Sequence, residues 1–179
     1  MKIIAAGEWN IKQLEALGAS GLSVAWPDAY QIIDRGVADG ITPQLNGLIG
    51  FRFAELVKYL TNMPLWFPTF YTVMNWDTWK SLSPDVQKVF TDVCGEYGID
   101  KWDSFHISYE QEAKDLSISK YGMKVLELTS DEKSKWNERV MPVRNEYVKR
   151  LDAAKLPGKK LLEEYDRLLK KWAAEPNPK

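Results

Sequence analysis

The residues best suited to covalent chemistry are scarce in this chain of 179 residues, which has one cysteine, Cys94, and one histidine, His106. A cysteine and a histidine act as nucleophile and base only within hydrogen-bonding distance of each other. Both fall in one predicted helix, where 12 residues of separation place them about 18 Å apart along the axis. We therefore expect a packed thiol at Cys94, a structural role for His106 and no catalytic residue.

Other signatures of catalysis or cofactor binding are also missing. No His-rich or Cys-rich spacing suits a metal ion, and no cluster of acids suits a hard cation. The glycines between Gly47 and Gly50 lack the spacing and the lysine of a phosphate-binding loop. A G-x-S-x-G nucleophile motif is not present. We expect a protein that is not an enzyme and that binds neither a metal nor another cofactor.

Aromatic side chains are the more promising candidates, because eight tryptophans among 179 residues is a high number. Trp9 and Trp26 follow predicted strands, and Trp66, Phe67 and Phe70 precede one. Pockets commonly form where such elements end. Each ring alone is about as well suited to a hydrophobic core, because aromatic residues dominate core burial. We expect these five residues to surround a binding cleft.

The bulk composition describes an ordinary water-exposed globular chain with one or two small domains. It is 45% hydrophobic and 27% charged, with a net charge of -1. A nearly neutral chain gives no reason to expect a nucleic-acid or anionic-membrane partner. A single cysteine excludes a disulfide within the chain, and no apolar run approaches the roughly 20 residues of a membrane span.

The segment from Trp26 to Pro43 predicts a helix and turn that follow a strand over 22–25. Asp28 falls in the first helical turn, where the helix dipole favours a carboxylate. Asp39 and Gly40 form a turn signal, because glycine supplies a positive φ without steric cost. In open α/β sheets, ligands bind where strands end. The turn and the loop after it, including Asp39 and Thr42, are therefore a candidate ligand loop; the alternative for Asp39 is that it simply caps the turn.

The rest of the chain predicts two further strands, over 70–75 and 123–128, besides one over 2–6. Ser83 and Pro84 start a helix that runs toward Ser117, with a kink near Gly95. Thr129 with Glu132 predicts a capping box for the next helix. Apolar spacing predicts three additional helices, over 11–17, from about residue 52 to 60, and over 161–172. Pro142 should bend the helix that follows the capping box.

Several of these segments resemble the solute-binding subunits of tripartite ATP-independent periplasmic (TRAP) transporters. The resemblance rests on motifs that occur here in the order the family has them. It covers nearly the whole chain, but only the second half of a typical family member. The matching segments are DAY at 28–30, GVADG at 36–40, FAELVKYLT at 53–61, VMN at 73–75 with Trp79, LSPDVQKV at 82–89, YGMKV at 121–125 and LTSDE at 128–132.

The resemblance implies an α/β fold, namely one lobe of a periplasmic-binding-protein-like (type II-like) fold with a long spine helix and C-terminal helices. It divides the chain into three parts. Residues 1–75 would form the α/β ligand-binding lobe, with a hinge strand at 70–75. Residues 76–120 would form the spine helix, and residues 121–179 a strand plus C-terminal helices that pack on the lobes.

The resemblance also implies a ligand site with two departures from the family. Ile4 stands where the family has an arginine for the ligand carboxylate, and Thr42 stands near the family's loop asparagine. Trp26 matches an aromatic residue that touches ligand. Glu8, beside Trp9, is suited to a cationic or hydroxylated ligand or simply to solvent. We expect the ligand to be held by aromatic stacking and hydroxyl contacts rather than by a bidentate carboxylate clamp.

The function implied is capture of a small organic solute, possibly an organic acid, for delivery to TRAP membrane subunits, without any bond being made or broken. The location implied is the periplasm, although the N-terminal residues do not form a recognisable signal peptide. The 70–75 strand and the spine helix would normally pack on a first lobe, so the isolated chain should form a homo-oligomer. The alternative is a helical protein-interaction module without a small-molecule ligand.

Overall fold

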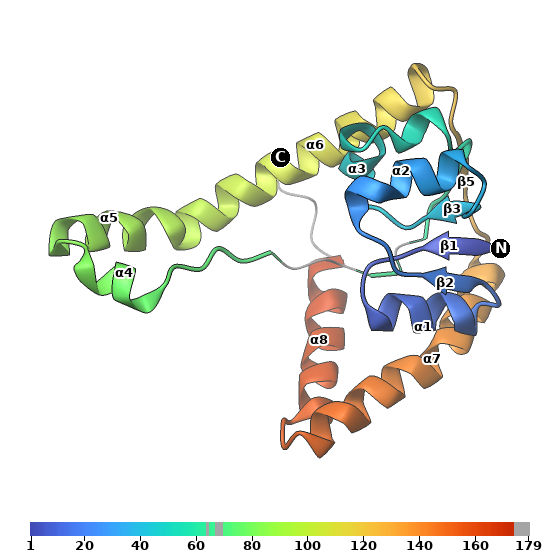
Figure 1. Cartoon of the computed structure of the whole chain (residues 1–179). Coiled ribbons are helices and arrows are strands. Elements are labelled where there is room, and N and C mark those ends of the chain that lie inside the picture. Colours follow the sequence, from blue (N-terminus) through green and yellow to red (C-terminus); the bar gives the residue numbers. More distant parts are fainter. Residues whose placement is uncertain (64, 67–69, 174–179) are drawn as a thin grey trace.

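The computed structural model describes residues 1–63, 65–66 and 70–173. Residues 172 and 173 are described by their backbone alone. Two small parallel sheets organise the body of the molecule (Figure 1). The first contains β1 (Lys2–Ile4) between β2 (Ser20–Leu22) and β3 (Gly40–Ile41). The second pairs β4 (Tyr59–Thr61) with β5 (Lys124–Leu126). The five strands of these sheets contradict an all-helical interaction module.

Helices supply the crossovers of the first sheet. Helix α1 (Glu8–Ala16) connects β1 to β2, and α2 (Trp26–Asp34) connects β2 to β3. The strand expected over 22–25 lies earlier in the chain, since β2 spans Ser20–Leu22 and shares only Leu22 with the expected range. Gly21 permits α1 to lie close to β2, since a Cβ on this residue would be 2.5 Å from Cγ2 of Ile11. The strand-helix-strand order predicted from the sequence is present.

The core lies between the first sheet, α2, and the segment that follows β3. That segment contains α3 (Leu45–Gly50) and a 3₁₀ turn, η1 (Phe53–Glu55). Phe53, with 0% of its surface exposed, is the largest fully buried side chain in the described part of the molecule. The other buried members of this cluster are small or aliphatic residues of sheet, helix and loop: Ile4, Ala29, Ala38, Leu48, Ala54 and Met123.

The helix expected from about residue 52 to 60 is wrong. Its apolar residues Leu56, Val57 and Leu60 instead follow η1 into strand β4. Leu60 alternates with the exposed residues Tyr59 and Thr61, as in a strand that is covered on one face. Residues 59–61 form a strand because they pair with β5, which lies more than 60 residues later in the chain. The spacing of apolar residues within 52–60 contains no information about that pairing.

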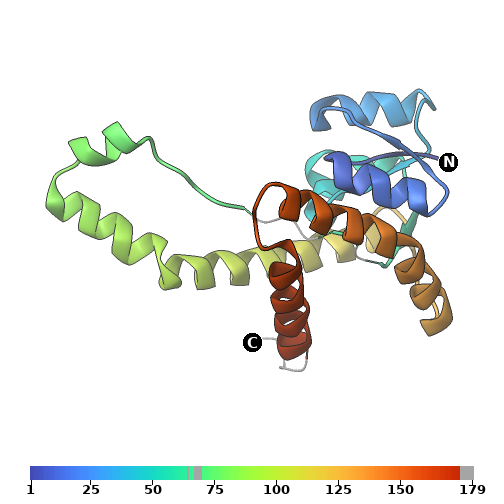
Figure 2. The same ribbon diagram turned by 90° about the horizontal axis from the view of Figure 1, so that it is seen from below.

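Helices α4 (Trp76–Ser81), α5 (Pro84–Cys94) and α6 (Glu96–Ser119) follow β4. We call residues 70–107 the arm, because they extend away from the two sheets (Figures 1 and 2). The expected strand over 70–75 is wrong, since these residues lie in neither helix nor strand. The spine helix expected over 76–120 is instead three helices, α4, α5 and α6. The kink expected near Gly95 is present as the break between α5 and α6, where Gly95 has φ -78° and ψ -144°. The C-terminal half of α6 returns to the body and packs on α3.

Two helices complete the described chain, α7 (Ser130–Ala153) and α8 (Gly158–Ala173), which pack on each other as a hairpin (Figure 2). The predicted capping box is confirmed: the Glu132 N–H donates to Thr129 Oγ1, and the Thr129 N–H donates to the Glu132 carboxylate. Pro142 lies inside α7. Arg144 joins the pair by donating to Asp166 Oδ1 at 2.6 Å. Among the helices described, none has the length and apolar character needed to cross a membrane.

Candidate functional site

A cleft of about 330 Å³ lies beyond the carboxyl ends of β2 and β3. Trp26, the first residue of α2, supplies one side, and the β3–α3 connection supplies another. Trp66 and Phe70 supply a third side. The lining residues are four aromatic rings and four smaller residues: Trp26, Phe51, Trp66, Phe70, Pro43, Gln44, Asn46 and Gly47. The position agrees with the rule that open α/β sheets bind ligands where parallel strands end.

Aromatic stacking orients the wall formed by Trp26 and Phe51. Their ring centroids are 6.2 Å apart with an interplanar angle of 26°. Phe53 stacks behind Phe51 at 5.6 Å and anchors it to the core. Arg52 between them has a φ of 62°, a left-handed conformation that is uncommon for a residue with a side chain. This conformation separates a buried Phe53 from a Phe51 that is 42% exposed.

A polar network holds the left-handed turn at Arg52. The guanidinium donates from Nε and Nη2 to the two carboxylate oxygens of Glu55, at 2.8 and 2.9 Å. Tyr30 of α2 also donates to Glu55, at 3.0 Å. The hydrogen bonds from Arg52 hold the pKa of the Glu55 carboxyl below its ordinary value, and the bond to Glu55 raises the pKa of Tyr30. The network therefore positions Phe51 from outside the cleft.

Polar groups in the cleft wall are amides. The Gln44 side chain has a buried Nε2 that finds no hydrogen-bond partner among the described residues. Asn46 lines the cleft beside it, but its backbone N–H is already used. Glu110 of α6 accepts from the backbone N–H groups of Leu45 and Asn46, at 2.7 and 3.1 Å. Glu110 thus caps α3 and fixes the spine helix against the cleft.

Of the eight predicted ligand residues, three lie together in this cleft: Trp26, Trp66 and Phe70. Phe67 falls outside the described residues. Thr42 is adjacent to the lining residue Pro43, but its hydroxyl and its N–H both donate to the Ile4 carbonyl, at 3.3 and 2.9 Å. Asp39 is also used within the sheet, because its carboxylate accepts from the Lys2 N–H at 2.7 Å.

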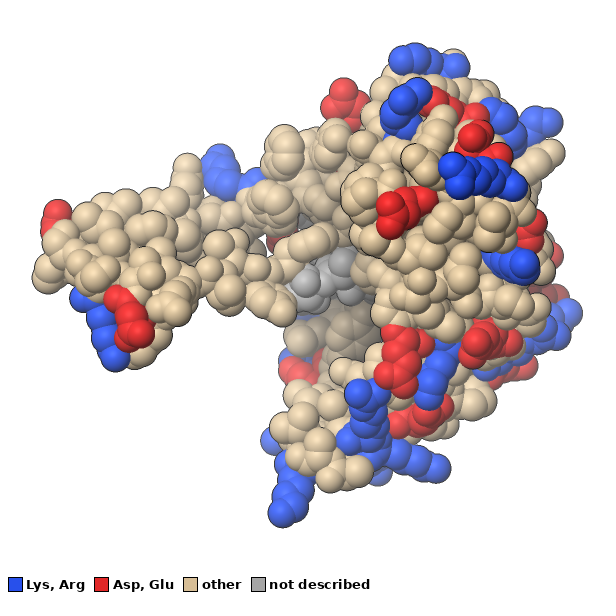
Figure 3. Space-filling model, in the orientation of Figure 1, with Lys and Arg blue, Asp and Glu red and all other residues tan. Residues whose placement is uncertain are grey.

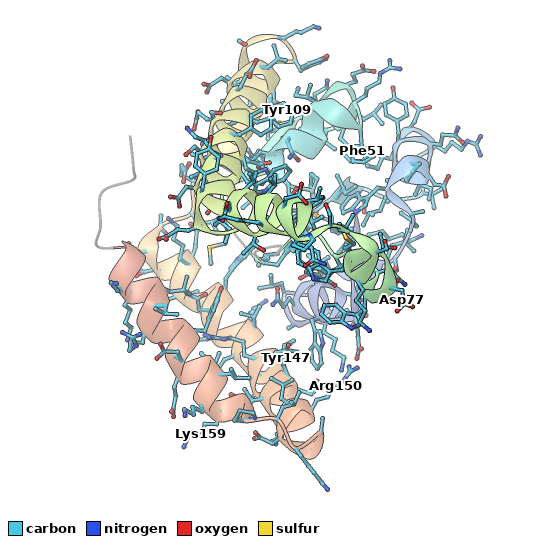
Figure 4. The ribbon with its side chains drawn as sticks, turned by 90° about the vertical axis from the view of Figure 1, so that its left-hand side faces the viewer. Phe51, Asp77, Tyr109, Tyr147, Arg150 and Lys159 are labelled. Atoms are coloured by element: carbon cyan, nitrogen blue, oxygen red, sulfur yellow. The ribbon has the colours of Figure 1, made fainter. Side chains whose placement is uncertain are left out.

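Glu8 and Trp9 lie away from the cleft and fasten α1 to α7. Arg150 donates to Glu8 at 2.8 Å, and the Trp9 and Tyr147 rings meet edge to face at 5.0 Å. Figure 4 shows Tyr147 and Arg150 on the side of α7 that faces α1. Lys12 lies 4.9 Å from the Trp9 ring centre and pairs with Glu146. The hydrogen bond from Arg150 lowers the pKa of Glu8, and that to Glu146 raises the pKa of Lys12. We call these residues the clasp.

Sequence reasoning missed Gln44, Asn46 and Phe51. Gln44 directly follows the loop that was singled out, so proximity to Pro43 was an available signal. Phe51 gave no such signal, since its exposure depends on the left-handed Arg52. Cys94 corrects another expectation: it is exposed on the arm and is not a packed thiol. His106 is in contact with aromatic rings, stacking on Trp102 at 6.1 Å and meeting Phe70 at 6.2 Å.

A second hollow, of about 300 Å³, lies between the end of α1 and the first half of α7. Leu17 and Trp136 form its apolar part, and the other lining residues are all charged: Glu132, Lys135, Glu138 and Arg139. It lies away from the carboxyl ends of the strands, and Glu132 is already used in the capping box. The aromatic cleft is therefore the better candidate for a ligand site.

The comparisons with known proteins agree with this architecture. The family model for bacterial extracellular solute-binding protein, family 7 (DctP), matches residues 4–150, and the chain belongs to that family. The C4-dicarboxylate-binding periplasmic protein DctP of Rhodobacter capsulatus is 25% identical over 146 residues. This alignment covers 79% of the chain but only 42% of that protein.

Solved structures show the same fold. A TRAP solute-binding protein from Rhodoferax ferrireducens, in complex with copurified benzoate, has a TM-score of 0.83 at 16% identity. A marine metagenome TRAP solute-binding protein specific for aromatic acid ligands has a TM-score of 0.79 at 20% identity. The matches cover 96% of this chain, and 54% and 55% of those chains. The predicted fold is confirmed: one lobe of a type II-like periplasmic-binding fold with C-terminal helices.

Proposed function

We propose that this chain is part of the solute-binding subunit of a TRAP transporter and that it holds a small organic solute in the aromatic cleft. The observation that carries the proposal is the position of this cleft, beyond the carboxyl ends of β2 and β3 and walled by four aromatic rings. Ring-walled clefts with a few polar groups suit small organic molecules. Similar proteins crystallised with benzoate and aromatic acids support the same kind of solute.

Capture would require no bond to be made or broken, so we propose a binding protein and not an enzyme. The solute would pass to TRAP membrane subunits, and the protein would work in the periplasm. Both statements are carried over from the family and its relative in Rhodobacter capsulatus, of which this chain spans less than half. Transport by vesicles containing the membrane subunits, with and without this protein, would test the delivery step.

Solute binding is tested by calorimetry and tryptophan fluorescence on the full chain, with a panel of aromatic acids, aromatic amides and C4-dicarboxylates. Trp26→Ala removes one wall, and we expect it to weaken binding about tenfold, since aromatic contacts contribute about 1 kcal/mol or more. Trp76→Ala is the matched control, because Trp76 lies on the arm and is 64% exposed. Equal losses in both variants, or no binding by the unmodified chain, would contradict the proposal.

The arm supports a further proposal about assembly. Apolar side chains such as Val89, Phe105 and Tyr71 are exposed along it, and Figure 3 shows its visible face with few charged residues. Related structures are almost twice as long as this chain, so much of their surface has no counterpart here. We propose that in the isolated chain a second copy covers the arm, because identical apolar faces can pair about a two-fold axis.

Light scattering after size exclusion tests this assembly. Val89→Lys introduces a charge on the apolar face of α5 and should convert the dimer to a monomer. Thr91→Lys is the control, since Thr91 lies on the opposite side of the same helix, about 200° away. A monomeric unmodified chain at micromolar concentration would contradict the proposal, as would a dimer unaffected by Val89→Lys.

A further inference from the structure

His106 of α6 touches both the wall of the aromatic cleft and an acidic side chain. Its ring meets Phe70, a lining residue, edge to face with the ring centroids 6.2 Å apart. The same ring stacks on Trp102, and its Nε2 lies 3.8 Å from Oε1 of Glu110. His106 is the only histidine of the chain, so a change of charge at this side chain can be assigned to a single residue.

Glu110 places a negative charge at the edge of the cleft. Its carboxylate accepts from the backbone N–H groups of Leu45 and Asn46, at 2.7 and 3.1 Å, and Asn46 is a lining residue. The lining residues that the structure describes carry no charge of their own. An anionic solute in the cleft would therefore be repelled by Glu110 unless a cation compensates that charge.

Three elements surround the imidazole of His106. Phe70 comes from the segment after β4, and α3 contributes Leu45 and Asn46 at the Glu110 carboxylate; none of these three residues is ionisable. On α6 itself, the exposed Asp103 lies one turn before His106, and Glu110 lies one turn after it. Among the described residues, Glu110 is the acid within 4 Å of the imidazole. The local charge therefore depends on the pair formed by His106 and Glu110.

Protonation of His106 would compensate the charge of Glu110. Histidine is the side-chain type whose charge ordinarily changes between about pH 5 and 8. A neutral imidazole leaves the carboxylate uncompensated, whereas an imidazolium 3.8 Å away forms an ion pair with it. Arg52, beside the wall residue Phe51, stays cationic over this range. It therefore adds a constant attraction for an anion and no pH dependence.

We propose that His106 is a specificity-determining residue of the cleft: protonated His106 favours an anionic aromatic solute, and neutral His106 leaves Glu110 to disfavour it. The inference rests on the function proposed above and adds the residue that sets the charge preference of its solute. His106 acts through its charge behind Phe70 and need not touch the solute, because charge interactions of partly buried groups extend over several ångströms. An uncharged solute of the same shape is indifferent to this change.

Benzoate and benzamide at pH 5.5 and pH 8 test the inference, because they share one ring and only benzoate is charged across this range. Calorimetry on the full chain should give a dissociation constant for benzoate about fivefold lower at pH 5.5 than at pH 8. The dissociation constant for benzamide should be the same at both. Proton uptake should accompany benzoate binding, and it is measured from the heats in buffers of different ionisation enthalpy.

The opposite results separate the inference from the proposed function. Benzoate affinity that is independent of pH, or that falls on acidification, would overturn the inference while leaving solute binding in place. An equal gain for benzamide would do the same, since an uncharged solute reports only a change in the shape of the cleft. Binding of no member of the panel at either pH would overturn the proposed function together with the inference.

Two variants of His106 fix its charge. His106→Gln cannot be protonated in this range and should hold benzoate binding at the weaker, pH 8 value throughout. His106→Lys carries a constant positive charge and should hold benzoate binding near the stronger, pH 5.5 value. An undiminished pH dependence in both variants, with their fold verified by circular dichroism, would overturn the assignment to His106.

The partner residue gives an independent test that leaves the imidazole in place. Glu110→Gln removes the negative charge but keeps an acceptor oxygen for α3, and it should strengthen benzoate binding at pH 8 about fivefold without affecting benzamide. Glu112→Gln is the matched control, because Glu112 is exposed two residues later on α6, about 200° around the helix. Equal gains in the two variants, or no gain in Glu110→Gln, would overturn the inference.

Discussion

The body and the arm of this molecule use the same residue types in opposite ways. Phe53 in the body is fully buried, whereas Phe105 on the arm is 59% exposed. Charged side chains gather over the body in Figure 3, while the arm shows mostly uncharged surface. An apolar residue therefore stabilises the chain by itself in the body, but on the arm it can contribute only when another surface covers it. Apolar residues of the body thus stabilise the fold of the single chain, whereas those of the arm are available for association with another surface.

Replacing phenylalanine in each region should give the largest contrast. Phe53→Ala should lower the free energy of unfolding by about 3–5 kcal/mol, because it removes a buried ring and leaves a cavity. Phe105→Ala should change it by about 0.5 kcal/mol or less when measured on the monomer. Urea unfolding followed by circular dichroism measures both. Similar losses would mean that the arm is part of the cooperative core.

Tryptophans sharpen the comparison at an intermediate level. Trp9→Ala should cost about 2 kcal/mol, because it removes the ring contact with Tyr147 and the cationic contacts of Lys12 and Arg150. Trp76→Ala should cost about 0.5 kcal/mol or less, since Trp76 is exposed and its ring meets Lys80. Thermal melting of the two variants checks the ranking. A larger effect at Trp76 would show that the clasp contributes little to stability.

Helix caps offer a smaller and more local contrast. Thr129→Ala breaks the capping box of α7 and should lower the free energy of unfolding by about 1 kcal/mol. Asn75→Ala removes the equivalent cap of α4, where Asn75 Oδ1 accepts from the N–H groups of Asp77 and Thr78. Because α4 buries no residue, its cap should affect amide exchange within the arm but not global unfolding. A global loss from Asn75→Ala would contradict this separation.

The pH dependence should be the smallest effect and should come from the body. Glu8 and Glu55 have pKa values below the ordinary 4.5 because Arg150 and Arg52, respectively, donate to them. Their stabilising contribution is complete above pH 4.5 and is lost as the pH falls through the lowered values. Glu55→Gln should therefore flatten the decline in melting temperature below pH 4.5, and Glu15→Gln, away from that network, should leave it unchanged. A rise in stability on acidification would have the wrong sign.

The cleft was only partly predictable from the sequence. Trp26 was identified because it begins a helix after a strand, a signal that depends on neighbouring residues. Trp9 has the same local context, yet it packs in the clasp because Tyr147 and Arg150, far along the chain, meet α1. Phe51 was missed because the Arg52 turn is held by contacts with Glu55 and, through it, Tyr30 of α2. Long-range packing therefore decided which aromatic rings face the cleft.

The sequence by itself determined the features that arise within one or two helical turns. Pro84 begins α5 because its ring fixes a helical φ. Thr129 with Glu132 forms the capping box of α7 because the interacting groups are only three residues apart. Helix α2, which Trp26 and Pro27 begin, has the same local origin.

Tertiary structure alone decided the remainder. Leu60 lies in a strand because β5 pairs with it, and α3 is capped because Glu110 of α6 accepts from the backbone N–H groups of Leu45 and Asn46. Whether such a segment forms a strand or a helix depends on the free energies of burial and hydrogen bonding with partners tens of residues away. No pattern within a short window contains them.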